Sequence, residues 1–316
     1  MKRFATELSQ RMGQRAWQQR LQMERRINPA SGMTWTRSLH RAIHLASKGL
    51  ISAVLSLAGQ RERAQSNCWT PTQTHPSLEL PRLKAKQQLT ILHLSDFHLD
   101  TRLSQATSWA EKIRSLNADL CVITGDFLNG FQLPSPDTLQ ALQTVIDAIP
   151  SPIFGILGNH DCMLCAPYLE EMGVTLLLNE TRSVRIHDLT LEITGLDDPH
   201  FFKSDDLDHA LRTRENVDAP DLRMLLVHAP MHPEIYAAAG FDLCLCGHTH
   251  GGQLCAPNGT PLLRNGRYRS DTLSGTWKQD TLRGYTSRGT GTGRLAYRLN
   301  CTPEIALLHV HAPQHS

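Results

Sequence analysis

The sequence lacks three features that would place it in a special class of protein. No stretch reaches the roughly 18 to 20 consecutive apolar residues that a membrane-spanning helix needs. The eight cysteines do not show the dense spacing of a small disulfide-bonded domain. The formal net charge is only +2. With 316 residues and 40% apolar content, the sequence instead predicts one large or two small globular domains with a real core.

The low net charge hides an uneven distribution along the chain. Residues 1–64 contain 12 Lys/Arg and 3 Asp/Glu, which gives +9. Residues 65–316 contain the other 20 Lys/Arg and 27 Asp/Glu, which gives −7. The basic segment has helical spacing, whereas residues 65–87 have the proline spacing of a linker. We therefore predict a basic helical N-terminal extension over residues 1–64, a linker over 65–87 and the main domain over 88–316.

Residues 49–59, GLISAVLSLAG, are the most apolar part of the extension, but they are too short to span a membrane. Basic residues and histidines flank them: Arg37, His40, Arg41, His44, Lys48, Arg61 and Arg63. One interpretation is an interfacial helix, which predicts peripheral membrane contact through residues 37–63 at the inner face of the membrane. The other is a helix that docks on the protein's own body or on a second subunit. Both stay open, as does the oligomeric state.

The cysteines and the few aromatic residues narrow the environment and the partners. Cys121, Cys244 and Cys246 lie inside apolar runs, where reduced cysteine packs as a small hydrophobic residue. This indicates a reducing compartment, so we expect a cytoplasmic protein. A structural zinc site that joins the C-x-x-C pair at residues 162–165 to the cysteines at 244 and 246 is a minor alternative. In the basic segment only Trp17 and Trp35 could stack on bases, so no specific nucleic-acid partner is expected.

Short apolar runs alternate with helical stretches after residue 88. The runs are LTILHLSD (89–96), DLCVITGD (119–126), SPIFGILGN (151–159), LRMLLVHA (222–229) and DLCLCGH (242–248). Residues 104–116 and 136–148 have helical spacing, and residues 182–195 alternate about a turn at His187-Asp188. The alternation predicts an α/β fold with buried strands, and the hairpin indicates two packed sheets.

Polar residues capable of chemistry follow each of the five runs. They are Asp96, His98, Asp126, Asn159, His160, Asp161, His228, His248 and His250. Taken singly, each has an ordinary structural explanation such as a helix cap, a turn or a hydrogen-bonded core histidine. Because strand ends in an open α/β sheet converge, we expect these side chains to meet in one crevice. Carboxylate, amide oxygen and imidazole suit zinc, manganese or iron, and their number suits two divalent ions that share a carboxylate.

These residues carry a resemblance to a known family. The blocks SDFHLD, TGDF, LGNHD, VHAP and CGHTHGGQ, within residues 90–254, resemble those of the calcineurin-like metallophosphoesterase superfamily. The resemblance implies a four-layer α/β/β/α sandwich of two mixed sheets with flanking helices. It also implies two ion sites: Asp96, His98, Asp126 and His250 in one, and Asp126, Asn159, His228 and His248 in the other.

The same resemblance implies the roles of the remaining residues in the set. A bridging hydroxide would attack phosphorus, while His160 stabilises the developing charge or protonates the leaving oxygen. Asp161 would orient His160, or it would cap the helix predicted over residues 162–172. Both interpretations of Asp161 stay open.

The C-terminal part of the chain points to a branch of this superfamily. Residues 284–310, with Ser287-Arg288-Gly289-Thr290-Gly291 and then Arg298, Pro303 and Glu304, resemble a bacterial, often membrane-associated branch. That branch includes UDP-2,3-diacylglucosamine hydrolases, which suggests a lipid-linked or nucleotide-lipid phosphoester substrate. Arg288 and Arg294 are candidate phosphate contacts, since guanidinium geometry suits phosphate oxygens. The alternatives are a soluble phosphatase or nucleotide phosphodiesterase, and a metal-holding scaffold without catalysis.

Overall fold

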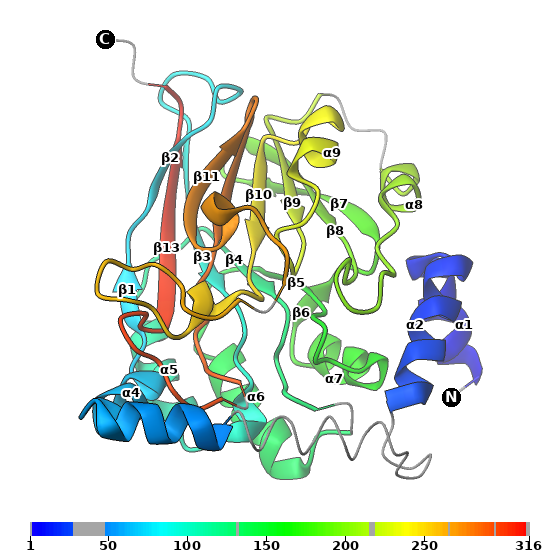
Figure 1. The fold of residues 1–316 in the computed structure, drawn as a ribbon. Coiled ribbons are helices and arrows are strands. Elements are labelled where there is room, and N and C mark those ends of the chain that lie inside the picture. The colour runs from blue at the N-terminus through cyan, green and yellow to red at the C-terminus, as the bar shows by residue number, and fades with distance from the viewer. Residues whose placement is uncertain are drawn as a thin grey trace.

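The computed structural model describes residues 2–27, 48–130, 133–214, 219–264, 266–293 and 295–313. Within these residues two β-sheets lie face to face, and helices cover the outer face of each sheet (Figure 1). This arrangement is the four-layer α/β/β/α sandwich that the sequence predicts, so the predicted fold class is confirmed.

Parallel strands form most of the first sheet. Its order is β1, β13, β3, β4, β5 and β6, and β2 also pairs with β13. Strands β3 to β6 are parallel to one another, whereas β13 runs antiparallel to β3, which makes the sheet mixed. The bounds are β1 Thr72–Thr74, β2 Ser77–Glu79, β3 Gln88–Leu94, β4 Leu120–Thr124, β5 Ile153–Ile156, β6 Val174–Leu176 and β13 Glu304–His311.

The second sheet is also mixed, with its antiparallel strands at the two edges. Its order is β11, β12, β10, β9, β8 and β7. The four central strands are parallel, and β11 and β7 pair antiparallel with β12 and β8. The bounds are β7 Glu180–Ile186, β8 Leu189–Gly195, β9 Leu222–Leu226, β10 Leu243–Cys246, β11 Gly275–Gln279 and β12 Leu282–Thr286.

Helices connect the parallel strands, and local capping explains where two of them begin. The Ser135 hydroxyl accepts the Thr138 N–H at the start of α6, and Asp206 accepts the His209 N–H at the start of α8. The α-helices are α1 Lys2–Met12, α2 Gln14–Ile27, α4 Arg61–Ser66, α5 Gln105–Arg114, α6 Pro136–Ile146, α7 Ala166–Glu171, α8 Leu207–Arg212 and α9 Pro233–Ala238. Residues 48–57 are also helical. The 3-10 helices are η2 Asn67–Trp69, η3 Leu99–Thr101, η4 Met163–Cys165, η5 His250–Gly252 and η6 Ser270–Thr272.

The core consists of three apolar layers, and each central strand serves two of them. Leu92 of β3 packs toward the outer helices with Trp109 of α5, while its neighbour Ile91 packs between the sheets with Leu245 of β10. Cys244, next to Leu245, faces the outer layer under α8 and α9. Because successive strand side chains point to opposite faces, a strand covered on both sides is apolar throughout. This explains the unbroken apolar runs in the sequence.

The secondary structure predicted for the main domain is largely confirmed. The five predicted runs contain β3, β4, β5, β9 and β10, and the two predicted helices contain α5 and α6. Strands β7 and β8 form the predicted hairpin, in which Ile186 pairs with Leu189 across the turn at His187-Asp188.

The prediction that residues 65–87 contain no regular element is wrong. Strands β1 and β2 lie in this interval, and both pair in parallel with β13. The prolines that suggested a linker, Pro71, Pro76 and Pro81, flank these short strands instead of interrupting them. The interval thus belongs to the first sheet. The predicted boundary between extension and main domain near residue 88 remains a prediction.

The N-terminal helices contact the main domain at two separate places. Leu8, Met12 and Ala16 of α1 and α2 join the apolar layer outside the first sheet, and Figure 1 shows both helices beside α7 and α8. Helix 48–57 packs through Leu55 against Tyr297 and its neighbours. The alternative that residues 49–59 dock on the protein's own body is therefore observed for helix 48–57. Residues 37–47 of the predicted membrane segment lie outside the described residues. In the part of the chain that the structure describes, no helix combines the length and apolarity needed to cross a membrane.

The structure contradicts the alternative of a four-cysteine zinc site. Cys162 and Cys165 pack in the layer outside the first sheet, whereas Cys244 and Cys246 pack outside the second sheet. The two pairs therefore do not meet. All eight cysteines are buried and free of disulfide bonds, which is consistent with their role as small apolar residues.

Leu245→Ala tests the layer between the sheets. Leu245 is fully buried, so its truncation should lower the free energy of unfolding by about 2 to 5 kcal/mol through lost burial and a cavity. Leu57→Ala is the matched control, since Leu57 is 90% exposed and should change stability by less than about 0.5 kcal/mol. Urea unfolding of the two variants measures both values. Equal losses would contradict this assignment of the core.

Candidate metal centre

The predicted ligands follow the carboxyl ends of strands from both sheets. Asp96 and His98 follow β3, Asp126 follows β4, and Asn159 follows β5. His228 follows β9 of the second sheet, and the last two, His248 and His250, follow β10. Because the two sheets are packed with these strand ends toward the same edge, all seven side chains come together, as the distances below show.

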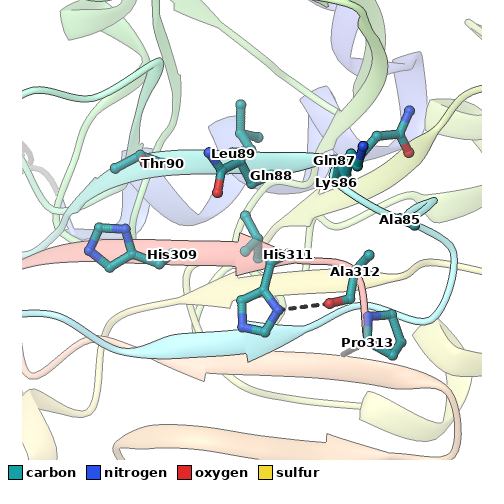
Figure 2. A pocket seen from close by; sticks show the side chains of 11 residues that line it. Ala85, Lys86, Gln87, Gln88, Leu89, Thr90, His309, His311, Ala312 and Pro313 are labelled. Atoms are coloured by element: carbon teal, nitrogen blue, oxygen red, sulfur yellow. Dashed lines mark hydrogen bonds between the residues drawn. The ribbon is translucent and has the colours of Figure 1, made fainter. Parts of the chain in front are cut away.

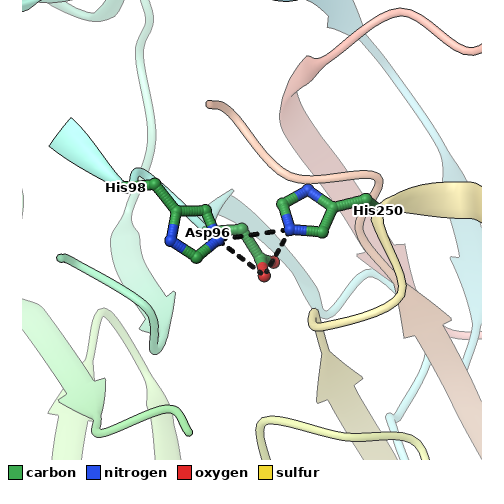
Figure 3. A group of neighbouring side chains, drawn as sticks. All are labelled: Asp96, His98 and His250. Carbon is green, nitrogen blue, oxygen red and sulfur yellow. Dashed lines mark hydrogen bonds and ion pairs between the residues drawn. The ribbon is translucent and has the colours of Figure 1, made fainter. Parts of the chain in front are cut away.

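Asp96, His98 and His250 form the first cluster, and their side chains point toward one another (Figure 3). The Nε2 atoms of His98 and His250 are 3.2 Å apart. The Asp96 Oδ1 atom lies 4.0 Å from His98 Nε2 and 3.5 Å from His250 Nε2. All three residues are buried. This spacing lets one ion contact one atom of each side chain.

A second cluster adjoins the first and shares Asp96 with it. It consists of Asp96, Asp126 and His228. The Asp126 Oδ2 atom lies 3.3 Å from His228 Nε2 and 3.5 Å from His98 Nε2, so this carboxylate stands between the two clusters. The Asn159 Oδ1 atom extends the second cluster, at 3.0 Å from His228 Nε2 and 2.7 Å from His248 Nδ1. Asp126 thus lies next to a histidine of each cluster, and its predicted role as the bridging ligand stays a prediction.

Backbone carbonyls determine which imidazole nitrogen faces the centre. His98 Nδ1 lies 3.2 Å from Leu128 O, and His228 Nδ1 lies 2.6 Å from Thr124 O. A carbonyl oxygen only accepts hydrogen bonds, so in both rings Nδ1 carries a proton and donates it. In neutral rings, Nε2 then directs its lone pair at the carboxylates and at the other imidazoles. Lone pairs that converge in this way repel one another unless a proton or a metal ion lies between them.

The buried carboxylates of the centre also favour the binding of a cation. Burial lowers the pKa of His98 to about 3 and raises the pKa of Asp96 to about 6. Burial alone would lower the pKa of His228, but the Asp126 carboxylate raises it to about 10. A proton on His228 thus partly compensates the carboxylates in the chain without ions, and a divalent ion would displace it. The donor set and its charge therefore fit divalent metal ions.

The backbone of the ligand loops is strained where it turns the side chains inward. Five ligands have φ between 44° and 69°, in the left-handed region that residues other than glycine rarely adopt, namely Asp96, His98, Asp126, His248 and His250. Each such residue costs of order 1 to 3 kcal/mol, and such strain clusters at functional sites. The strained ligands identify this edge of the sheets as a candidate functional site.

Two glycines let the backbone approach the carboxylates closely. A Cβ atom added at Gly158 would overlap Asp126 Oδ1, and one added at Gly247 would overlap Ser95 Oγ. The glycines that precede Asn159 and His248 in the sequence blocks thus make room for the shared carboxylates.

His160 lies on the accessible side of the centre. Its backbone N–H donates to Asp126 Oδ1 at 2.8 Å, and its ring lies edge-on to that of His98 with centroids 5.2 Å apart. His160 is half-buried, whereas most of the ligands are fully buried. The predicted catalytic role of His160 stays a prediction.

Asp161 is buried beneath the same loop and joins two backbone segments. Its carboxylate accepts the Gly158 N–H at 2.9 Å and the Leu128 N–H at 3.0 Å. The alternative of a helix cap is wrong, because Cys162 and Cys165 occupy the N-cap positions of η4 and α7. The predicted effect of Asp161 on His160 stays a prediction.

The two candidate phosphate contacts differ in what the structure says of them. The Arg288 guanidinium forms a fork with Glu304 Oε2, with distances of 3.1 Å from Nε and 2.9 Å from Nη2. The Nε and Nη2 donors of Arg288 are therefore engaged by the Glu304 carboxylate. A contact between Arg288 and phosphate remains a prediction. Arg294 lies outside the described residues.

Several residues near the centre were missed by the motif analysis. His200 packs against His248 with ring centroids 4.7 Å apart, and its Nδ1 lies 2.8 Å from the Tyr268 hydroxyl. The fully buried Arg298 guanidinium lies 2.9 Å from His250 Nδ1. Arg298 belonged to a recognised tail motif, but its contact with His250 did not follow from that motif. His200 and Tyr268 carry no local signal because only the folded chain brings them to the ligands.

A separate cavity of about 420 Å³ lies away from this centre (Figure 2). Residues 85–90 and 309–313 line it, so it lies at the amino end of β3. The predicted ligands follow the carboxyl end of the same strand. The cavity contains none of them and has no part in the chemistry considered below.

The fold and the donor set define a metal-binding hydrolase of phosphoesters. Residues 89–252, just over half of the chain, match the calcineurin-like phosphoesterase family, and the chain belongs to that family. The chain is 30% identical over 203 residues to phosphodiesterase YaeI of Escherichia coli (strain K12). The aligned residues cover 61% of this chain and 70% of that protein. The protein is therefore a phosphoester hydrolase, as the sequence predicts.

Other relatives and solved structures are similar over comparable lengths. Uncharacterized protein YpbG of Bacillus subtilis (strain 168) is 29% identical over 251 residues, which is 77% of this chain and 88% of that protein. The crystal structure of TT1561 of Thermus thermophilus has a TM-score of 0.43 at 11% identity and covers 66% of this chain and 91% of that chain.

Asp126→Ala tests the shared position of this carboxylate. Because Asp126 lies between the clusters, its loss should abolish binding of both ions and reduce turnover to background. Asp147→Ala is the control, since this aspartate is exposed at the end of α6 and should leave ion binding unchanged. Titration with Mn²⁺, followed by elemental analysis, measures the ion content. An Asp126→Ala protein that keeps two tightly bound ions would contradict the bridge.

Proposed function

We propose that the protein hydrolyses a phosphodiester or pyrophosphate with two divalent ions, manganese, iron or zinc. Asp96, His98, Asp126 and His250 would hold one ion, and Asp126, Asn159, His228 and His248 the other. When bound, the ions lower the pKa of water in the site and neutralise charge on the phosphoryl oxygens. The two adjoining clusters, which share Asp96 and have Asp126 between His98 and His228, are the observation that carries this proposal.

The chain's own residues would orient these groups and move a proton. The carbonyls of Leu128 and Thr124 hold the rings of His98 and His228 so that Nε2 faces the ligands of the metal centre. His160, anchored through its backbone on Asp126, would donate a proton to the leaving oxygen. Leaving-group protonation by a half-buried histidine suits a poor leaving group such as an alkoxide.

We further propose that the substrate is linked to a lipid, with UDP-2,3-diacylglucosamine as the example. The exposed face of helix 48–57 supports membrane contact: Leu50, Val54 and Leu57 are 67%, 56% and 90% exposed and follow one another at helical spacing. Lys48, Arg61 and Arg63 flank this stripe. Apolar side chains with a basic border fit the inner, anionic face of a membrane. An enzyme held there meets its acylated substrate where it resides.

A short substrate panel tests the reaction. Metal-replete protein should hydrolyse an aryl phosphodiester and UDP-2,3-diacylglucosamine faster than an aryl phosphomonoester or a cyclic nucleotide. Preference for the monoester or the cyclic nucleotide would instead support the alternative of a soluble phosphatase or nucleotide phosphodiesterase. Two bound ions with no hydrolysis of any of the four compounds would support the metal-holding scaffold.

His160→Ala separates catalysis from ion binding. Because His160 acts on the leaving group in this proposal, the variant should keep both ions and lose about 100-fold or more in kcat. His75→Ala is the control, since His75 is an exposed histidine between β1 and β2. The loss of kcat in His160→Ala should be smaller for substrates with acidic leaving groups. Equal loss of ions from His160→Ala and Asp126→Ala would contradict the separate roles.

Vesicle sedimentation tests the membrane contact. Replacing Leu50, Val54 and Leu57 together by Gln should weaken binding to phosphatidylglycerol vesicles about tenfold or more, because buried apolar area is lost. The same replacement of Leu133, Leu164 and Ile235, which are also exposed, is the matched control. Equal binding by the two triple variants would contradict a membrane-facing helix. A wild-type dimer that the first triple variant disrupts would assign the stripe to a second subunit.

A further inference from the structure

Helix α2 places one fully buried guanidinium inside the main domain. Arg20 has no exposed surface, whereas Arg15 and Arg25 of the same helix are exposed. Arg20 forms an ion pair with the buried Asp197, and its guanidinium lies 4.2 Å over the ring of Phe202. A buried ion pair has a large desolvation cost and is poor evidence for stability by itself. The special position of Arg20 therefore calls for another explanation.

The remaining donors of Arg20 hold the loop that carries two residues of the metal centre. Nη2 donates to Asp161 O at 2.6 Å and approaches Gly158 O at 3.4 Å. These two carbonyls bracket Asn159 and His160. Because a guanidinium is planar and rigid, contacts to both ends of a short loop restrict the conformation of the residues between them.

Glu24, one turn further along α2, extends this support. Its Oε1 atom accepts the Arg20 Nε–H at 3.1 Å and the Met163 N–H at 2.9 Å. The backbone on the C-terminal side of the loop is thus also tied to α2. Together the two side chains connect one face of the helix to residues 158–163.

The same helix also contacts a second loop beside the centre. The Gln19 amide donates to Phe202 O at 3.0 Å and to Lys203 O at 2.6 Å. This loop begins with Asp197, the partner of Arg20, and carries His200, which packs on His248. Helix α2 thus lies between two loops that each place a side chain at the metal centre.

We propose that Arg20 is a positioning residue of the metal centre, which holds Asn159 and His160 in place through the carbonyls of Gly158 and Asp161. This inference rests on the proposed function and adds a role for the N-terminal helix pair, which lies outside the matched family region of residues 89–252. Helix α2 then supports the loop that carries Asn159 and His160.

Arg20→Lys tests the proposal with the charge kept. Lysine can still pair with Asp197, so the variant should fold, but its single ammonium cannot contact Asp197, Glu24 and the two carbonyls as the three guanidinium nitrogens do. We expect Mn²⁺ affinity at the site that includes Asn159 to fall about 10- to 100-fold, with a similar loss in kcat and little change in KM. Amide hydrogen exchange of residues 158–163 should become faster.

Arg11→Lys is the matched control. Arg11 of α1 also anchors the helix pair, through Glu170 and Glu180 at 2.7 Å each. These partners lie on α7 and β7, not on the loop at 158–163. Arg11→Lys should therefore lower the melting temperature as much as Arg20→Lys while leaving Mn²⁺ affinity and loop exchange unchanged.

The outcomes distinguish this proposal from the proposed function. Wild-type Mn²⁺ affinity and unchanged loop exchange in a folded Arg20→Lys protein would overturn the positioning role, as would equal changes in the Arg11 and Arg20 variants. Mn²⁺ titration and hydrogen exchange need no substrate. A wild-type protein that binds two ions but hydrolyses no phosphoester would therefore refute the proposed function. The effect of Arg20→Lys on Mn²⁺ affinity and loop exchange could still be measured in that case. If Arg20→Lys does not fold, Glu24→Gln, which weakens the hold on Met163 N–H, should give the same pattern to a smaller extent, and its absence would overturn the proposal.

Discussion

The convergence of buried carboxylates and imidazoles is the constraint on which the rest of this structure depends. The Nε2 atoms of His98 and His250 stand 3.2 Å apart, with the buried carboxylates of Asp96 and Asp126 beside them. Water is excluded from these groups, so their charge and lone pairs are not screened. Divalent ions among them would neutralise the carboxylates and replace the proton that the raised pKa of His228 keeps there. A chain that maintains this arrangement is suited to bind metal ions, which agrees with its membership in a phosphoesterase family.

The surrounding fold offsets the free-energy cost of this site. Five ligands adopt left-handed backbone conformations, each at a cost of order 1 to 3 kcal/mol. Three continuous apolar layers offset this cost, and they hold the strand ends from which the ligands extend. Buried hydrogen bonds then align the loops: Asp161 connects Gly158 to Leu128, and backbone carbonyls orient the imidazole rings. The sheets supply the stability, and five of the residues with left-handed backbone are ligands at the carboxyl ends of their strands.

The basic residues of the N-terminal segment lie in different environments. Arg20 is buried against Asp197 beside the metal-binding loops, whereas Arg15 and Arg25 remain in solvent. Helix 48–57 buries Leu55 on the main domain and exposes Leu57 on its other side. The same local excess of positive charge thus serves internal ion pairs in one helix and borders an apolar surface in another. The net charge of the segment does not distinguish these uses.

Local chemistry and strand periodicity were enough to predict strands β3, β4, β5, β9 and β10, the β7–β8 hairpin and the polar residues that follow those five strands. This worked because a buried strand needs an apolar run, and a metal ligand needs one of a few side chains directly after it. The strands of residues 72–79 were not predicted, since three-residue strands stabilised only by pairing with β13 leave no periodic pattern. The positions of Arg20, His200 and Tyr268 beside the centre were likewise beyond local analysis. Their partners lie far away in the sequence, and contacts of that kind exist only once the layers have packed.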